Sequence, residues 1–324
     1  MPIRFLRTAL LALIPIIATA ADGAAQSWPQ RPVRIVIPYA PGGGTDNLVR
    51  LLQPHMSAAL GQQVVIENKP GASSTIGTEI AARAPADGYT FLATDSAVLV
   101  NPGLLKNMPY DTLRQFVGLT MMARAPVILV AHASVPAKSL KELLELARAK
   151  PGALTYASGG NGTSTHLAAE LMKLEAKVDI LHVPYKGTAP AMNDLLAGQV
   201  SMQFAGISAA KPHVEAGKLN AIALTGEGRN AAMPSVPTFE EAGVANVDAD
   251  TYWGVYAPTG TPPEIVRRLR DIIVEAIRQP ATAERATQLG YVPIMNTPDE
   301  HDRQMRQMIA RWAEVIRTAK IAAD

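Results

Sequence analysis

The chain has 324 residues, of which 48% are hydrophobic and 18% charged, so it can bury a sizeable core and is long enough for two domains. Its formal net charge is +2 and its Lys and Arg residues are scattered along the sequence, which argues against a nucleic-acid partner. It contains no cysteine, which excludes disulfides, thiolate metal ligands, a cysteine nucleophile and a lipidated N-terminal cysteine.

The first 25 residues have the order typical of a secretory signal peptide. Arg4 and Arg7 precede an apolar run at 9–18, small residues follow it, and cleavage is expected between Ala20 and Ala25. The apolar run is too short to span a bilayer. An exported chain without thiols fits a soluble periplasmic protein that depends on its core alone for stability.

From Trp28 onward, β-rich runs alternate with segments of helical periodicity, which predicts βαβ units and mostly parallel sheets flanked by helices. A first series predicts strands at 33–40, 63–70 and 90–96, with helices at 46–60 and 75–84. A second series predicts strands at 127–136, 154–160, 179–185, 200–206 and 219–226, with helices at 139–152, 164–175 and 189–199. A strand that ends in a turn at 251–263, then helices at 264–279 and 299–319, close the chain.

Two such series with a return at the end predict an α/β fold of two lobes joined by two crossings. The crossings are expected near residues 124–130 and 248–256. Lobe 1 is then expected to comprise residues 26–126 and 252–324, and lobe 2 residues 127–251.

Turns rich in Gly, Ser and Thr follow strands of both series. They read PGGGTD at 41–46, PGASST at 70–75, SGGNGTSTH at 158–166, PYKGTAP at 184–190 and FAGIS at 204–208, and Thr94-Asp95-Ser96 ends a further strand of the first series. In an open α/β sheet, ligands bind beyond the carboxyl ends of strands, where helix N-termini offer unpaired N–H groups and a partial positive charge that suits an anion. Because the turns come from both lobes, they predict one small polar ligand gripped from two sides.

Familiar catalytic and cofactor motifs do not fit these turns. The first turn lacks the Gly-Lys-Ser/Thr ending of a phosphate loop, and Asn47 stands where a dinucleotide fingerprint needs its third glycine. No G-x-S-x-G or H-E-x-x-H motif occurs, and His166 with Glu170 supplies only two possible zinc ligands. The prediction is therefore no catalytic residue, no metal and no cofactor. A secreted hydrolase or lyase that uses His166 and Asp46 is the rival enzyme hypothesis.

Asp46 and His166 each allow a structural and a functional interpretation. Asp46 in a first helical turn could complement the helix dipole, which is worth up to about 1 kcal/mol. In a ligand site it would orient water or ligand hydroxyls, because a carboxylate repels an anionic ligand directly. His166 could be a helix N-terminal residue that is hydrogen-bonded to a neighbouring loop, or it could lie at the site.

Several long stretches together resemble one protein family. They include WPQRPVRIVIPYAPGGGTD, VIENKPGASSTIG, GNGTSTHLAAEL, HVPYKGTAPAMNDLLAGQV and YWGVYAPTGTPPEIVRRL, and they run in family order over nearly all of the chain after residue 25. The chain thereby resembles the periplasmic substrate-binding proteins of tripartite tricarboxylate transporters, the TctC or Bug type. The resemblance implies a two-lobed Venus-flytrap fold of the type II periplasmic class. It also implies a monomeric, non-enzymatic protein that binds a small carboxylate and delivers it to membrane permease subunits.

The resemblance further implies which residues hold the carboxylate, largely through backbone N–H groups and ordered waters. The expected residues are Gly42, Gly43, Thr45 and Asp46 in the first turn, Ala72 and Ser73 in the second, Gly162, Thr163, Ser164 and His166 in the third, and Tyr39, Thr94 and Tyr185 at strand ends facing the cleft.

One departure from the family pattern bears on the ligand. Many members carry Asp where this chain has Ala205, so a ligand amino group would lose that partner. The departure favours a carboxylate without an amine, aliphatic or aromatic. The sequence does not identify the acid, and a ligand sensor that docks on a receptor kinase is a further alternative to a transport protein.

Overall fold

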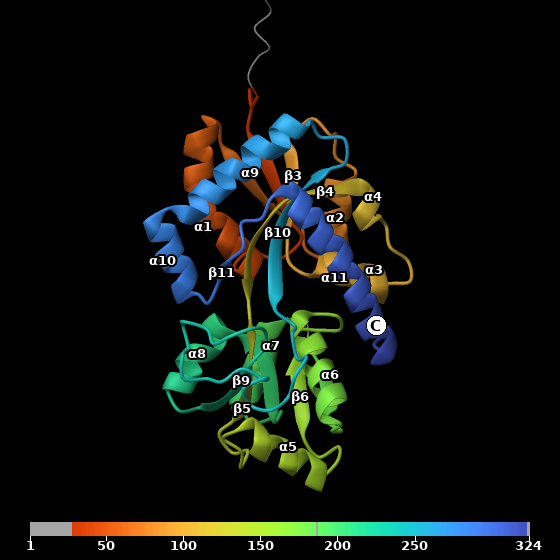
Figure 1. Ribbon diagram of the computed structural model, residues 1–324, viewed down its shortest axis with the longest axis vertical. Helices are drawn as coiled ribbons and strands as arrows, with labels where there is room; N and C mark the ends of the chain where they lie inside the picture. Colours follow the sequence, from red (N-terminus) through yellow and green to blue (C-terminus); the bar gives the residue numbers. More distant parts are fainter. Residues whose placement is uncertain (1–27, 186, 323–324) are drawn as a thin grey trace, which may run out of the picture.

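The computed structural model describes residues 28–185 and 187–322, so the expected signal peptide lies outside the described residues. The described chain forms two α/β lobes, one above the other in Figure 1, and each lobe has its own sheet flanked by helices. The two-lobed α/β fold expected from the sequence is confirmed.

The first lobe is built on a six-stranded sheet in the order β11-β4-β10-β3-β1-β2. Its strands are β1 (Val33–Ile37), β2 (Val64–Asn68), β3 (Thr90–Thr94), β4 (Phe116–Ala125), β10 (Thr251–Pro258) and β11 (Val292–Pro293). Its helices are α1 (Gly44–Leu60), α2 (Thr75–Ala82), α3 (Ala97–Leu104), α4 (Thr112–Gln115), α9 (Pro263–Arg278), α10 (Pro280–Gln288) and α11 (Pro298–Thr318).

The second lobe is built on a five-stranded sheet in the order β7-β6-β8-β5-β9. Its strands are β5 (Val127–His132), β6 (Thr155–Ser158), β7 (Leu181–Pro184), β8 (Met202–Gly206) and β9 (Leu219–Leu224). Its helices are α5 (Leu140–Ala149), α6 (Ser164–Ala176), α7 (Thr188–Leu196) and α8 (Ile207–Glu215).

Both sheets are mixed, whereas the sequence pattern predicts mostly parallel ones. β1 pairs in parallel with β2 and β3, but β10 is antiparallel to β3 and β4, and β5 is antiparallel to β8 and β9. The difference comes from the strands that follow the two crossings. β5 and β10 enter their sheets from the other lobe and run away from the cleft, whereas strands of βα units run toward it.

The two crossings are joined by a buried ion pair. The first crossing runs from β4 through Pro126 into β5, and the second leads into β10 at Thr251. The Arg124 guanidinium binds the fully buried carboxylate of Asp250, which also accepts a 2.9 Å hydrogen bond from Thr225 Oγ1. Thr225 Oγ1 in turn accepts from the Val127 N–H at 3.0 Å. One connected network therefore holds both crossings and the end of β9.

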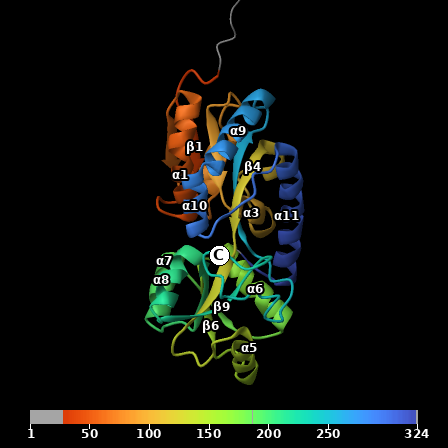
Figure 2. The same cartoon turned by 60° about the vertical axis from the view of Figure 1, so that its left-hand side comes forward.

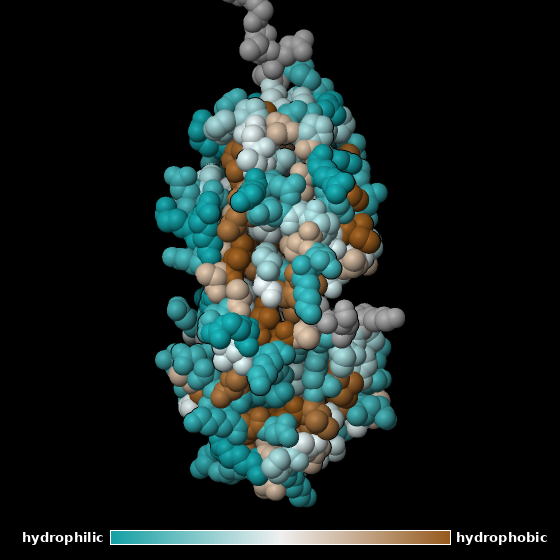
Figure 3. All heavy atoms as spheres, turned by 90° about the vertical axis from the view of Figure 1, so that its right-hand side faces the viewer, coloured by the Kyte–Doolittle hydropathy of each residue, from teal (hydrophilic) through white to brown (hydrophobic). Residues whose placement is uncertain are grey.

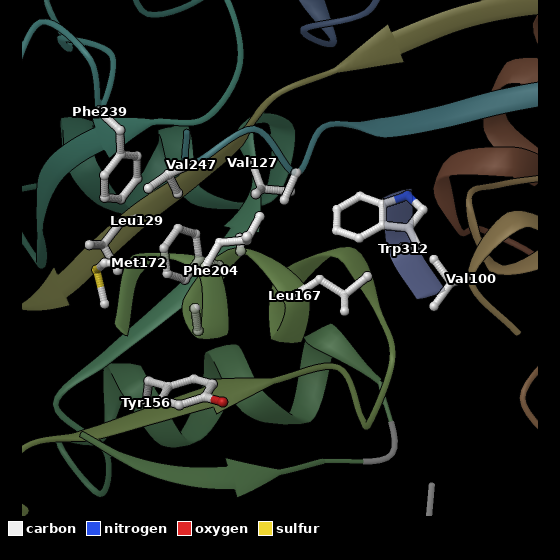
Figure 4. Close-up of a cluster of buried hydrophobic side chains, with 14 of the residues drawn as sticks. Val100, Val127, Leu129, Tyr156, Leu167, Met172, Phe204, Phe239, Val247 and Trp312 are labelled. Carbon is white, nitrogen blue, oxygen red and sulfur yellow. The ribbon is translucent and has the colours of Figure 1, made fainter. Parts of the chain in front are cut away.

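Helix α11 links the cores of the two lobes. It begins with a capping box between Thr297 and Glu300, and Figures 1 and 2 both show it running along the first lobe toward the second. Its buried Trp312 belongs to one apolar cluster with Val100 of α3 and Leu167 of α6, and Figure 4 shows these side chains close together. The hydrophobic core is thus continuous from one lobe to the other.

The face of the molecule drawn in Figure 3 is largely hydrophilic. On the face in Figure 3, apolar residues form narrow bands and small groups between hydrophilic side chains. Only three large apolar side chains count as exposed in the described part of the chain, namely Ile76, Leu174 and Leu181. None of the helices between residues 28 and 322, position 186 aside, combines the length and the hydropathy that a membrane span needs.

Candidate functional site

A cleft of about 890 Å³ lies between the two lobes, a volume in the range of ligand pockets. Its walls come from the turns that follow strands in both sheets and from the crossing at Pro126. Apolar side chains, among them Leu104, Ile207 and Trp253, alternate with small polar ones. The cleft can therefore hold a ligand with a hydrocarbon part and polar ends.

Six helices begin at this cleft, three from each lobe. The lining includes the N-cap or first residue of each, namely Gly43 of α1, Ser74 of α2, Ser96 of α3, Thr163 of α6, Thr188 of α7 and Gly206 of α8. Of these six, only α6 has a bond to the side chain of its N-cap residue within the described ranges, from the His166 N–H to Thr163, and in α3 the first N–H, that of Ala97, is donated to Asp95 Oδ1. In α1, α2, α7 and α8 the described residues provide no side-chain cap, so N-terminal N–H groups are available to a ligand, and each of the six helices adds a partial positive charge.

The first turn is held from behind by Asp46. The Asp46 carboxylate is buried and accepts hydrogen bonds from the Gly42 N–H at 2.9 Å, Arg50 Nε at 2.8 Å and Asn68 Nδ2 at 3.0 Å. Burial alone would raise the pKa of Asp46, but these hydrogen bonds, led by that from Arg50, lower it below its usual value. Asp46 thus fixes the turn that presents Gly42 and Gly43 to the cleft.

The second turn is conformationally strained. Ala72, Ser73 and Ser74 follow one another with φ of 44°, 52° and 71°, a left-handed conformation that costs roughly 1–2 kcal/mol per residue outside glycine. Asn101 Nδ2 holds the turn by donating to the Ser73 carbonyl at 2.9 Å, and Thr75 Oγ1 donates to the Ala72 carbonyl at 2.7 Å. Strain of this kind is typical of ligand sites, where the surrounding structure imposes it.

The third turn depends on a neutral histidine. His166 is buried, its Nδ1 accepts from the Gly162 N–H at 3.0 Å, and its ring stacks on His182 with 4.2 Å between centroids. Burial, and secondarily His182, lower the pKa of His166 to about 4. The neutral ring can accept the Gly162 N–H, so it fixes the turn that carries Thr163 and Ser164.

Strand ends contribute tyrosines and an acid. Tyr39 donates its hydroxyl to Asp95 Oδ1 at 2.5 Å, and the Ala97 N–H donates to the same oxygen at 2.9 Å. On the opposite lobe, Tyr185 donates to Asp194 Oδ2 at 2.6 Å, and this bond raises the pKa of Tyr185 to about 12. Both tyrosines are therefore neutral hydroxyls oriented by acids.

The structure brings most of the expected site residues to one cleft. Its lining includes Tyr39, Gly42, Gly43, Ala72, Ser73, Gly162, Thr163, Ser164 and Tyr185. Thr45, Asp46, Thr94 and His166 do not line it and are buried behind its wall. For Asp46 and His166 the structural interpretation describes what the side chains do here, since each holds the turn beside it.

Sequence reasoning missed several lining residues. Trp253 and Tyr291 come from the last quarter of the chain, pack edge to face at 4.9 Å, and Tyr291 donates its hydroxyl to the Gly44 carbonyl at 3.0 Å. No turn motif marks them. Asn101 also lines the cleft, and so does Asp95, which lies in the turn predicted after the third strand although only Thr94 of that turn was assigned to the site.

The described residues contain no group of three or more His, Cys, Asp or Glu side chains arranged to hold a metal ion. The described residues that line the cleft offer a ligand backbone N–H groups, hydroxyls, amides and the Asp95 carboxylate.

Comparisons with known proteins agree with this architecture. Residues 48–321 match the family model described as Tripartite tricarboxylate transporter family receptor. The chain is 36% identical to Protein BugT of Bordetella pertussis over 316 residues, which cover 96% of this chain and 97% of BugT. Among solved structures it is similar to R. palustris Rpa4515 with adipate, at 35% identity over 92% of this chain and 100% of that one, with a TM-score of 0.85. It is also similar to MatC from Rhodopseudomonas palustris with bound malate, at 31% identity over 89% and 100% of the two chains, with a TM-score of 0.80.

Proposed function

The chain belongs to the tripartite tricarboxylate transporter receptor family, and on that premise we propose that it is a periplasmic solute-binding protein. It captures a small carboxylate in the cleft between its lobes and delivers it to the membrane permease subunits of a tripartite-type transporter. The observation that carries the proposal is the convergence of six helix N-termini on one cleft. Two similar structures hold adipate and malate, both small carboxylates.

The proposed binding mode follows from those helix ends. Each N-terminus is equivalent to roughly half a positive charge and typically stabilises a nearby anion by about 0.3–1 kcal/mol. A hydrogen bond to a carboxylate is charge-assisted, which makes it about twice as strong as a neutral one. The ligand-binding residues we propose are those that line the cleft: Tyr39, Gly42, Gly43, Ala72, Ser73, Gly162, Thr163, Ser164 and Tyr185.

The rival enzyme hypothesis needs Asp46 and His166 to reach a substrate. Both side chains are buried, they belong to different lobes, and each is hydrogen-bonded within its own turn. The proposed lobes, residues 26–126 with 252–324 and residues 127–251, instead act as two jaws that share one ligand. A binding protein uses this arrangement without any catalytic group.

Native mass spectrometry of the purified protein, followed by calorimetry with a panel of C4 to C8 mono- and dicarboxylates, tests the proposal. We expect a bound acid that is released unchanged and rebinds with a defined Kd. A strain that lacks the protein should lose uptake of that acid and regain it with the wild-type gene. Binding by no carboxylate, or turnover of the bound molecule, would refute the assignment.

A further inference from the structure

We propose that Asp95 makes the cleft selective for carboxylates that also carry a hydrogen-bond donor, a hydroxyl or an ammonium group. This inference rests on the proposed function and narrows the class of ligand. It concerns a residue outside the glycine turns, on the lobe-1 side of the cleft.

Among the described residues, the hydrogen bonds to the Asp95 carboxylate all go to one of its oxygens. Oδ1 accepts from both Tyr39 Oη and the Ala97 N–H. Within residues 28–185 and 187–322, Oδ2 has no hydrogen-bond partner. A carboxylate can accept about four hydrogen bonds, so the unused oxygen leaves a strong acceptor on the wall of a ligand cleft.

Burial raises the pKa of Asp95 above its usual value, and the hydrogen bonds that Oδ1 accepts from Tyr39 and the Ala97 N–H oppose that rise. Two donors point at Oδ1, and the residue lies directly before the N-terminus of α3, where the helix dipole stabilises an anion. Tyr39 and the α3 cap also fix the orientation of the carboxylate, so Oδ2 is presented in one position. Tyr39, itself a lining residue, thereby also positions Asp95.

The charge pattern of the cleft determines which part of a ligand faces Asp95. Among the lining residues that the structure describes, Asp95 is the only one with a charged side chain. A ligand carboxylate is therefore attracted to the uncapped N-termini of α1 and α2 and repelled from Asp95. The part of the ligand that faces Asp95 must donate a hydrogen bond, because otherwise the Asp95 carboxylate would lose its bound water without gaining another partner.

Three acids with one carbon skeleton test this selectivity. Succinate, malate and aspartate differ only by a hydrogen, a hydroxyl or an ammonium group on one carbon. Adipate and its 2-hydroxy and 2-amino derivatives repeat the comparison for a longer ligand. By calorimetry on the full-length mature protein, we expect at least one donor-bearing acid to bind at least tenfold more tightly than its parent.

Variants of Asp95 test whether this residue causes the preference for donor-bearing acids. Asp95→Ala removes the acceptor and should bring the affinities within each series to within about threefold of one another. Asp95→Asn keeps a carbonyl acceptor but no charge, so it should retain a preference for a hydroxyl and lose one for an ammonium. Asp95→Ser preserves a side-chain cap for α3 in case the alanine variant is unstable. Asp271→Asn, an exposed acid on α9, is the matched control and should bind as wild type does.

The outcomes separate this inference from the proposed function. If wild type binds the parent acids as tightly as their derivatives, or if the preference persists in Asp95→Ala, Asp95 does not select the ligand and the carboxylate-binding function stands. If no member of either series binds and the wider panel also fails, the proposed function fails and this inference fails with it.

Discussion

A side chain added at Gly43 should block ligand binding without disturbing the fold. Gly43 is the N-cap of α1 and lines the cleft, with φ −76° and ψ 173°, a conformation open to any residue. The nearest heavy atom to an added Cβ would be the Ala40 carbonyl oxygen at 3.8 Å, which is ordinary contact. Gly43→Val therefore fits the backbone, and its methyl groups occupy the space where a ligand carboxylate approaches the helix N-terminus.

The expected loss follows from the bonds that are blocked. Loss of one charge-assisted hydrogen bond costs about 1.5–3 kcal/mol, so Kd should rise roughly 10- to 150-fold. Calorimetry with the tightest-binding acid of the panel measures the change, and a thermal melt checks that the fold is intact. Ala59→Val adds similar bulk at an exposed position near the other end of α1 and should leave Kd unchanged. An unchanged Kd in a folded Gly43→Val protein would refute the assignment of this turn to the ligand.

Three further variants test the groups behind the cleft. Asp46→Asn removes the charge that Arg50 pairs with, so Tm should fall by about 2–4 °C at pH 7. Because folding lowers the pKa of Asp46, the difference in Tm between the variant and wild type should shrink as pH drops below about 4. A difference in Tm that stays constant with pH would contradict the role of the charge. His166, with a pKa of about 4 when folded and about 6.5 when unfolded, contributes stability that is complete above pH 6.5 and lost as pH falls toward 4. In urea titrations, wild type should therefore lose about 2 kcal/mol more than His166→Asn between pH 7 and pH 5, and equal losses would show that the ring is not held neutral. Arg124→Met leaves the carboxylate of Asp250 buried without its cation and should lower the free energy of unfolding by about 3 kcal/mol. The double variant with Asp250→Asn should lose less, and additive losses in that cycle would argue against a coupled pair.

The periodic parts of the fold could be predicted from the sequence, and the irregular parts could not. Strands with helices after them were recognisable because each helix carries a regular apolar face. Helices α3 and α8 were not predicted, and each contains a proline, Pro102 or Pro212; α1 also contains one, Pro54, but its length of 17 residues makes its apolar face recognisable. Strand β4 was not predicted because it is buried on both faces and so shows no alternation of apolar and polar residues. Helix α10 was not predicted because Ala286 is the one residue that it buries, so it has no apolar face.

The candidate site could likewise be predicted only in part from the sequence. Glycine-rich turns indicated which backbone segments border the cleft, because a glycine at a strand end has no Cβ and lets a ligand approach the backbone closely. Whether a polar residue in a first helical turn faces ligand or protein depends on its tertiary neighbours. Asp46 turns inward to Arg50 and Asn68, whereas Asp95 lies on the cleft wall. Trp253 reaches the cleft only because β10 returns to the first sheet.

The position of β10 has a consequence for the order in which the chain folds. β10 lies between β3 and β4 in the first sheet, yet residues 251–258 follow every strand of the second lobe in the sequence. The second sheet can be completed from residues 127–224 alone. Until β10 has been synthesised, β3 and β4 each keep an unpaired strand edge that can pair with the wrong strand. The strands of the inserted lobe are therefore all synthesised before the last strands of the lobe that begins the chain, and a chain cut after residue 250 contains every strand of one sheet but lacks β10 and β11 of the other.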